Sequence, residues 1–340
     1  MEYSVIKGLQ KEAERLAQKR PPLPTEISAL KVRLKRFAQR HKECLGEMPA
    51  KKYPLQPVIE EKVIFDDSGV VQERVIYHSE ELVKVPAHVY YHQEAKGKKP
   101  GVLLLQGWES LGKYSFPFFK IRLAQEGFLV ILPDNRCSGE RRRESNSEIE
   151  QLNIVPVALS LGKTFMGMNT YDNIRAIDYL VSRGDVDPER IAVVGLCWGG
   201  MQAYNLAALD RRVGCCVAIN ANSTYRALIR HHITYSYHTC LGTYIPNLLK
   251  YGDTTDIYAL IAPRPLLIAN NANDNWFPLE GYQEICRELE GVYHAFGKPE
   301  NFKHLLSSNL HDIVGVYRKE AIAWLNKHLK KSEEGGRKDV

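Results

Sequence analysis

A single cysteine, Cys197, lies in the sharpest turn that the sequence predicts. The stretch from Ile191 to Tyr204 reads I-A-V-V-G-L-C-W-G-G-M-Q-A-Y, a short apolar run, then G-x-C-x-G, then a helix-like pattern. Strand, tight turn and helix in this order form a nucleophile elbow, where a strained backbone exposes the nucleophile between small residues. The helix N-terminus favours the reactive thiolate. A cysteine with only a packing role would not need the three glycines of this stretch.

A thiolate nucleophile needs a general base and an acid that orients the base, and two downstream residues suit these roles. In an elbow of this type the acid comes next in the chain and the histidine comes last. Asp274 directly follows the expected strand and its turn, whereas its rivals Asp253 and Asp256 precede that strand. His311 lies in the loop between the last expected strand, residues 302–306, and the last amphipathic helix.

Other histidines fit the base less well. His304 falls within the last strand, His294 in the helix before it, and His328 near the end of the final helix. No H-x-E follows the elbow, so the chain lacks the acid position of class I glutamine amidotransferases, which carry a similar elbow. The order cysteine, aspartate, histidine therefore predicts an esterase-type reaction through an acyl-thioenzyme.

The negative oxygen that develops during acyl transfer needs two backbone N–H donors. We expect one from Trp198, directly after the nucleophile, and the other from the loop Q-G-W-E that follows the apolar run V-L-L-L. Trp108 is the first choice for this second donor and Gly107 the next, since a glycine lets the backbone approach a substrate closely. Trp276, two residues after Asp274, closes the acid loop against the floor of the site.

Short apolar runs must form the sheet that positions these residues. Several runs are apolar throughout, as in parallel strands buried on both faces: 102–105, 128–133, 191–195, 214–219 and 265–269. Alternating runs predict antiparallel strands at one edge: 58–65, 71–77 and 83–91. The expected fold class is α/β, with a mostly parallel, doubly wound sheet whose catalytic loops emerge at the carboxyl ends of the strands.

We expect the chain to divide into an N-terminal helical extension, residues 1–50, an α/β domain, residues 51–330, and a disordered tail, residues 331–340. The intervals 136–168 and 222–256 are too long for simple connections and predict lid insertions. Two helices of the extension each have one apolar face. These faces must pack either on the α/β domain or on a second subunit, and the latter would give a homo-oligomer.

Composition argues against several classes of protein. The net charge of +6 is spread along the chain and leaves no nucleic-acid footprint. The seven cysteines lack a disulfide framework, the N-terminus lacks a secretion signal, and no apolar run approaches the roughly 18 residues of a membrane span. His231, His232 and His238 lack zinc-site spacing, and the elbow is the only glycine-rich turn after a strand. We therefore expect a cytoplasmic protein without metal, cofactor, membrane or nucleic-acid partner.

On these motifs the chain resembles the dienelactone hydrolase family of α/β-hydrolases. G-L-C-W-G-G matches the family's elbow, in which cysteine is the usual nucleophile, and Asp274 and His311 match its acid and base. The resemblance covers roughly residues 58–330. It implies an α/β-hydrolase fold and hydrolysis of a small carboxylic ester or lactone. The helical extension, G-M-N-T-Y-D-N-I-R-A-I-D-Y-L and Y-G-D-T-T-D-I-Y-A-L-I-A-P-R-P-L-L-I are similar to the acetylxylan-esterase-like branch.

The sequence departs from dienelactone hydrolase proper where the substrate would bind. That enzyme lacks the helical extension and the long insertions. Glu109 is offset from the glutamate that the family places beside its cysteine. Arg136, which follows the P-D pair, is the candidate for one of the arginines that the resemblance implies around a substrate carboxylate. Glu109, Arg136 and Trp276 are the substrate-binding candidates, but dienelactone itself is not implied. The alternative is a catalytically silent protein of this fold that binds a small molecule or a partner.

Overall fold

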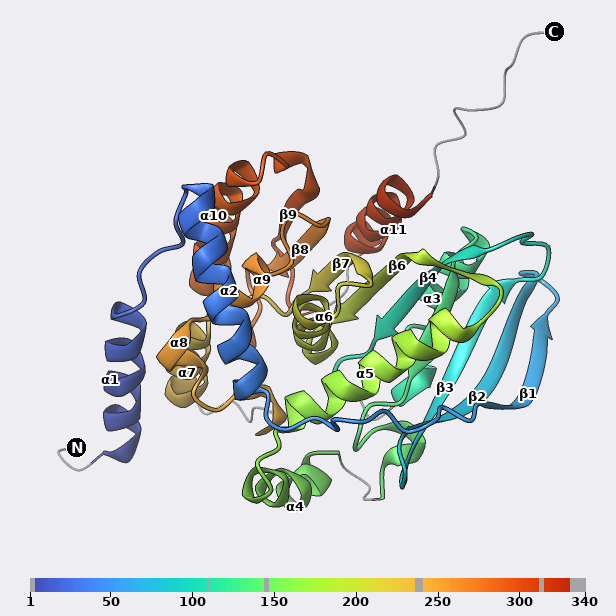
Figure 1. Ribbon diagram of the computed structural model, residues 1–340, viewed down its shortest axis with the longest axis horizontal. Coiled ribbons are helices and arrows are strands. Elements are labelled where there is room, and N and C mark those ends of the chain that lie inside the picture. The colour runs from blue at the N-terminus through green and yellow to red at the C-terminus, as the bar shows by residue number, and fades with distance from the viewer. Residues whose placement is uncertain (1–3, 109–110, 144–146, 236–240, 312–314, 331–340) are drawn as a thin grey trace, which may run out of the picture.

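The computed structural model describes residues 4–108, 111–143, 147–235, 241–311 and 315–330. Its strands are β1 (Val58–Phe65), β2 (Val70–Glu80), β3 (Val83–His92), β4 (Lys99–Leu105), β5 (Leu129–Pro133), β6 (Val186–Leu196), β7 (Val213–Ile219), β8 (Leu266–Asn271) and β9 (Phe302–Ser307). Within the described residues they form one nine-stranded sheet in the order β1-β2-β3-β5-β4-β6-β7-β8-β9 (Figure 1).

The sheet is mixed, with its antiparallel part at the β1 edge. β1, β2, β3 and β5 pair antiparallel, and every pair from β5–β4 to β8–β9 is parallel. This architecture confirms the predicted α/β-hydrolase fold. β6 begins at Val186 rather than at residue 191, because Val186 and Asp187 at its amino end pair with Lys99 and Pro100 of β4.

Helices cover both faces of the sheet. One face carries α2 (Ile27–Cys44), α5 (Phe165–Ser182), α6 (Trp198–Leu209), α9 (Thr254–Ala259) and α10 (Leu279–Ala295). The other face carries α3 (Pro117–Gln125) and α11 (Gly315–Leu329).

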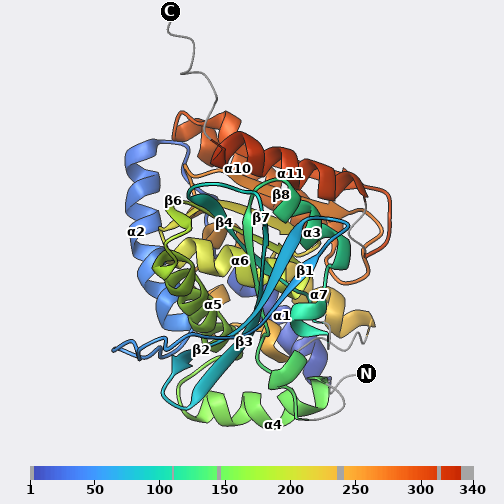
Figure 2. The same ribbon diagram turned by 90° about the vertical axis from the view of Figure 1, so that its right-hand side faces the viewer.

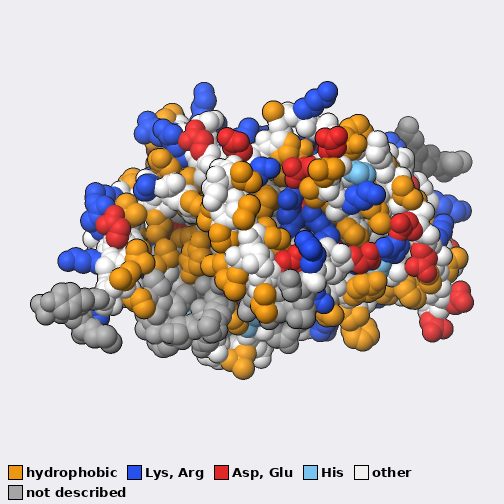
Figure 3. Space-filling model, turned by 90° about the horizontal axis from the view of Figure 1, so that it is seen from below, with side chains coloured by type: hydrophobic (Ala, Val, Ile, Leu, Met, Phe, Trp, Pro, Cys, Tyr) orange, Lys and Arg blue, Asp and Glu red, His pale blue; other side chains and the backbone are white. Residues whose placement is uncertain are grey.

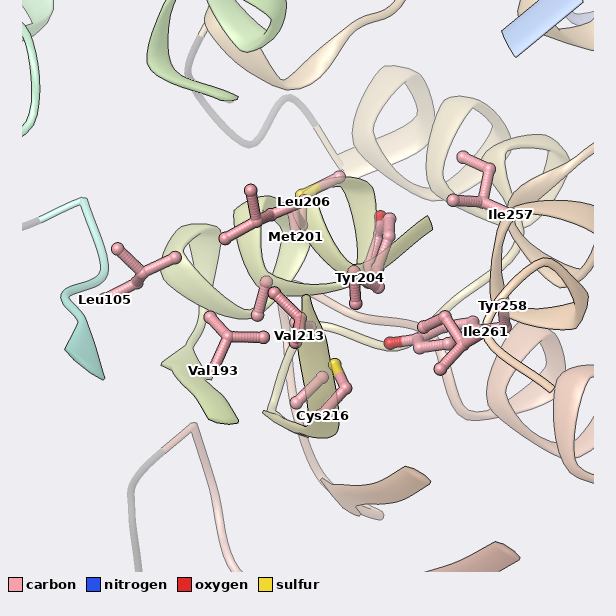
Figure 4. Packing of buried hydrophobic residues seen from close by; sticks show 14 of the residues in the cluster. Leu105, Val193, Met201, Tyr204, Leu206, Val213, Cys216, Ile257, Tyr258 and Ile261 are labelled. Atoms are coloured by element: carbon pink, nitrogen blue, oxygen red, sulfur yellow. The ribbon is translucent and has the colours of Figure 1, made fainter. Parts of the chain in front are cut away.

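Alternation of side chains along each strand explains why the central strands are apolar throughout. Val193 and Cys216 pack in one core, and their neighbours Val194 and Cys215 pack in the other. Figure 4 shows Val193 and Cys216 in the same core as Met201 of α6. Both faces of a strand must therefore be apolar for the strand to be buried.

Helical segments occupy both predicted insertions. Between β5 and α5 lie η2 (Gly139–Arg141) and α4 (Ser147–Ser160), and between β7 and β8 lie α7 (Tyr225–Tyr235), η3 (Leu241–Thr243), α8 (Leu248–Tyr251) and α9. In Figures 1 and 2, α4 lies at the end of the molecule opposite α10 and α11. Hydrophobic side chains gather on this end (Figure 3), and Leu152 and Val157 of α4 are exposed.

Among the described residues, no helix has both the length and the apolar character needed to span a membrane.

The N-terminal helices α1 (Val5–Gln18) and α2 both contact α8 and otherwise pack on different helices. α2 contacts α6, α8 and α9 and buries Leu34 and Phe37, while α1 contacts α7 and α8. α1 leaves Val5, Ile6 and Leu9 exposed. The apolar face of α2 therefore packs on the α/β domain, and oligomerisation through α1 stays a prediction. The predicted tail, residues 331–340, lies outside the described residues.

Candidate active site

Cys197 lies at the junction of β6 and α6 with φ 56° and ψ −126°. This is a strained conformation for a residue with a side chain, and tight packing around the turn maintains it. A Cβ on Gly199 would overlap the carbonyl oxygen of Leu105, and one on Gly195 would overlap the backbone of Gly199. The prediction that small residues must flank the cysteine is confirmed. The side chain of Cys197 is half-buried at the N-terminus of α6.

Asp274 and His311 meet at the carboxyl ends of β8 and β9. Oδ2 of Asp274 lies 2.7 Å from Nδ1 of His311, and Oδ1 of Asp274 accepts hydrogen bonds from the backbone N–H groups of Trp276 at 2.7 Å and Phe277 at 3.2 Å. The carboxylate is fully buried. Three contacts therefore fix the orientation of the Asp274 carboxylate, and that carboxylate orients the imidazole.

His311 also forms a hydrogen bond with the side chain of Cys197. Burial disfavours the protonated imidazole, but the hydrogen bonds with Asp274 and Cys197 and the charges of both outweigh it and raise the pKa of His311 to about 10. At neutral pH the imidazole is therefore protonated beside the sulfur. The structure thus places the ring of His311 in contact with both the carboxylate of Asp274 and the side chain of Cys197.

The expected oxyanion donors lie next to Cys197. Trp198 is the first residue of α6, where a backbone N–H has no acceptor within the helix. A Cβ built on Gly107 would lie 3.1 Å from the Cβ of Cys197, so this glycine lies directly against the nucleophile. The ring of Trp108 is 5.1 Å from that of Trp198, and Trp198 stacks on Phe165 at 5.5 Å. This aromatic cluster holds the loop after β4 against the elbow.

Comparison with known proteins places this site in a family. Residues 85–234 match the model of the dienelactone hydrolase family. The protein YtaP of Bacillus subtilis (strain 168), named only as a hydrolase, is 31% identical over 313 residues, which are 86% of this chain and 99% of YtaP. The chain belongs to the dienelactone hydrolase family.

Solved structures of similar fold carry the names of esterases. Methylesterase BT1017 has a TM-score of 0.75 at 19% identity, over 93% of this chain and 68% of that protein. The acetyl xylan esterase from Paenibacillus sp. R4 has a TM-score of 0.61 at 18% identity, over 93% of this chain and 99% of that enzyme. At these identities the likeness shows the fold alone.

Of the residues proposed to contact the substrate, Trp276 lies beside the candidate base. Its ring centroid is 6.4 Å from that of His311 and 37% of the residue is exposed. Phe277 stacks on His311, with 5.9 Å between the two ring centroids. Trp276 is thus available to a ligand at the mouth of the site, while Phe277 is buried. Glu109 lies outside the described residues.

Arg136 lies in a buried ion-pair network. Its Nε and Nη2 donate to the carboxylate of Asp172 at 2.8 and 2.9 Å, and Nη2 also donates to Glu80 at 2.7 Å. Burial disfavours the charge, but Asp172 and Glu80 outweigh this and raise the pKa of Arg136. Arg141 shares Asp172, at 2.8 Å. The guanidinium of Arg136 is therefore engaged by protein carboxylates where the sequence suggested a substrate carboxylate.

Sequence reasoning missed the residues that hold the His311 loop and the α7 segment. Asn271 donates to the carbonyl oxygen of Leu310 at 2.5 Å, and Asn273 donates to that of Ser308 at 2.5 Å. A ring nitrogen of His231 in α7 lies 2.8 Å from the carbonyl oxygen of Asn275, next to Asp274. The asparagines at the end of β8 were a signal for the first of these contacts, because amides at a strand end commonly bond neighbouring backbone.

Proposed function

We propose that this protein hydrolyses small carboxylic esters or lactones, with Cys197 as nucleophile, His311 as proton carrier and Asp274 as the group that orients it. The observation that carries the proposal is the position of His311, which bonds Asp274 at 2.7 Å and also bonds Cys197 at the elbow. Membership of the dienelactone hydrolase family supports the reaction class.

Acylation begins from the pair of thiolate and imidazolium. The sulfur of Cys197 attacks the carbonyl carbon, a C–S bond forms, and the carbonyl electron pair moves onto oxygen. Backbone N–H groups of Trp198 and of the loop at Trp108 and Gly107 receive this negative charge. The C–O bond to the leaving alcohol then breaks, and His311 gives its Nε2 proton to the alkoxide, which leaves an acyl-thioenzyme.

Deacylation uses the same histidine in the opposite sense. Neutral His311 takes a proton from water as the water oxygen attacks the thioester carbonyl. The tetrahedral intermediate collapses, the C–S bond breaks, and the carboxylic acid leaves. Cys197 is again a thiolate beside a protonated His311, so the cycle closes without a cofactor.

The substrate class we favour is a polar ester, such as an acylated sugar, or a lactone. The names methylesterase and acetyl xylan esterase among structures of this fold agree with a small acyl or alkoxy group. Tyr225 of the segment 222–256 is buried and donates to the carbonyl oxygen of Thr243, so this part of the segment is a packed cap. The exposed ring of Trp276 offers an apolar surface next to His311.

The proposal is tested with p-nitrophenyl acetate and a panel of acetylated sugars and lactones. We expect a pre-steady-state burst of nitrophenol from the wild-type protein, a mass increase of one acetyl group that maps to Cys197, and no turnover by Cys197→Ala. Cys286→Ala, which removes a thiol in α10, is the matched control and should retain the burst.

Alkylation separates the esterase from a silent scaffold. A thiolate at Cys197 should react with iodoacetamide at pH 7 about tenfold or more faster than a free thiol, which is only a few per cent ionised there. Equal ester turnover by the wild type and Cys197→Ala would contradict the proposal. Slow alkylation without turnover on any ester or lactone of the panel would favour the catalytically silent binding protein.

The cytoplasmic location of the protein stays a prediction.

A further inference from the structure

A groove of about 720 Å³ lies between α1, α2 and α8, outside the residues that surround Cys197. α1 and α2 both contact α8, and Figure 1 shows the three helices together at one side of the molecule. We call this the basic groove, because six cationic side chains line it: Lys19, Arg20, Arg33, Arg36, Arg40 and Lys250. No carboxylate is among its described lining residues. A volume of this size is typical of a small-molecule site.

Buried acids behind the wall neutralise part of this charge. Arg20 donates to Asp256 at 2.5 Å and to Glu288 at 2.8 Å, and Arg33 donates to the other oxygen of Asp256 at 2.7 Å. Asp256 is fully buried, and the side chain of Glu288 is 16% exposed. The two positive charges of these arginines cancel the two negative charges of these acids. The four residues therefore form the structural wall of the groove and add no net charge to it.

The remaining cations exceed the acids near them. Arg40 pairs with the exposed Glu43 at 2.7 Å. Within the part of the chain that the structure describes, Lys19, Arg36 and Lys250 form no ion pair within 4.0 Å. Lys19 and Lys250 attract Glu12 at longer range, but Glu12 already bonds Arg15. The groove therefore holds an excess of positive charge, which a concave wall concentrates.

Apolar groups lie between these cations. Val32 of α2 is 63% exposed although it lies in the groove, and Leu16 and Leu249 line it from α1 and α8. Tyr251 is 44% exposed, and the guanidinium of Arg40 lies over its ring at 5.1 Å from the centroid. A ligand that fits this surface carries negative charge for the rim and an apolar or aromatic body for the floor.

We propose that the basic groove is a binding site, distinct from the candidate active site, for an organic anion that carries two or more negative charges and an apolar body, such as an aryl phosphate. Its charged end lies among Lys19, Arg36 and Lys250, and its apolar end lies against Val32 and Tyr251. The groove does not depend on Cys197, so this inference stands apart from the proposed hydrolysis.

Calorimetric titration of the full-length protein at low salt tests the site. The probes are phenyl phosphate, inorganic phosphate and inorganic pyrophosphate. We expect saturable binding of phenyl phosphate with a Kd below about 1 mM, weaker binding of inorganic phosphate, and loss of affinity as added salt screens the charges. Arg36→Gln/Lys250→Gln should weaken the binding of phenyl phosphate at least tenfold. Val32→Asn should remove the higher affinity of phenyl phosphate relative to inorganic phosphate.

Lys31→Gln/Lys35→Gln is the matched control, because it removes the same charge from exposed positions of α2 outside the groove. It should leave the affinity within twofold, and thermal melting checks that every variant is folded. Equal weakening by the control and by the groove variant would reduce the effect to net charge and overturn the proposal. Absence of saturable binding of any of the three probes to the wild-type protein would overturn it as well. If pyrophosphate bound as tightly as phenyl phosphate, the proposed contribution of the apolar body of the ligand to binding would be overturned. Titration of Cys197→Ala should match the wild type whether or not esters are hydrolysed.

Discussion

Asn271, at the end of β8, donates its side-chain N–H to the carbonyl oxygen of Leu310 at 2.5 Å, and Leu310 directly precedes His311. A second bond, from the backbone N–H of Ala272 to the carbonyl oxygen of Ser307 at 2.6 Å, joins the same two loops. These two hydrogen bonds join the loop that carries His311 to the loop that carries Asp274.

Asn271→Leu keeps the approximate volume of the side chain and removes this donor. We expect kcat for an active ester to fall about tenfold, the effect of a buried hydrogen bond of roughly 1.4 kcal/mol, with KM within twofold. A positioning role also predicts a changed pH profile of kcat. Asn301→Leu removes a comparable amide-to-carbonyl bond, to Pro263 at 2.8 Å, away from the site and serves as control. An unchanged kcat in Asn271→Leu would show that the loop holds its place without this bond.

The imidazole of His311 should keep its proton well above neutral pH. Its pKa in the folded protein is raised from 6.5 to about 10, so protonation stabilises the fold fully below about pH 6.5, and this contribution is lost as the pH rises through about 10. Nuclear magnetic resonance of the ring should show an imidazolium at pH 8. Cys197→Ala and Asp274→Asn should each lower the pKa, since each removes a partner of the charged ring. A wild-type ring that titrates near pH 6.5 would refute the ion pair.

Gly107→Ala tests the close approach of the loop after β4 to the nucleophile. The added methyl would lie 3.1 Å from the Cβ of Cys197, which is closer than ordinary carbon contacts, so either the loop or the elbow must shift. We expect kcat/KM to fall by about tenfold or more, because the oxyanion donors and the sulfur lose their alignment. Gly184→Ala, whose Cβ would meet nothing within 4 Å, is the control. Wild-type kinetics in Gly107→Ala would exclude a tight oxyanion loop at this position.

Arg136→Met distinguishes a structural arginine from one that binds substrate. The change leaves Asp172 buried with Arg141 as its remaining partner, so the free energy of unfolding should fall by about 3 kcal/mol. KM for neutral esters and for esters with a carboxylate should stay within twofold of the wild type. Urea unfolding and steady-state kinetics provide the two measurements. A selective rise of KM for carboxylate-bearing esters, with unchanged stability, would instead assign Arg136 to the substrate.

Deletion of residues 1–48 should destabilise the protein. It removes Arg20 and Arg33, the partners of the fully buried Asp256, and exposes the surface that Phe37 covers. We expect a lower melting temperature, with Asp274 and His311 still in place, because the candidate catalytic residues all come from later in the chain. Arg20→Met/Arg33→Met tests the ion pairs with the helices kept, and should also lower the melting temperature. Equal melting temperatures for the wild type, the truncated protein and the double variant would show that the extension does not stabilise the fold.

The elution volume of the truncated protein in size-exclusion chromatography tests whether the protein oligomerises through α1.

Local sequence was sufficient where backbone geometry or apolar alternation within a few residues decides the structure. The glycines around Cys197 are needed because no larger side chain fits the turn, so the stretch from Ile191 to Tyr204 is enough to predict the elbow. The central strands could also be predicted from the sequence. A strand buried on both faces must be apolar at every position, as it is at Cys215 and Cys216. The chain order of acid and base then indicated Asp274 and His311 as candidates.

Only the tertiary structure decided which distant groups meet. Arg136 engages Asp172 and Glu80, Asn271 engages Leu310, and Arg20 engages Asp256, all between elements far apart in the sequence. The side chains themselves carry no information on such pairings, since an arginine suits a substrate carboxylate and a protein carboxylate equally well. The choice depends on how helices dock on the sheet, which is set by packing of the whole core rather than by any local pattern.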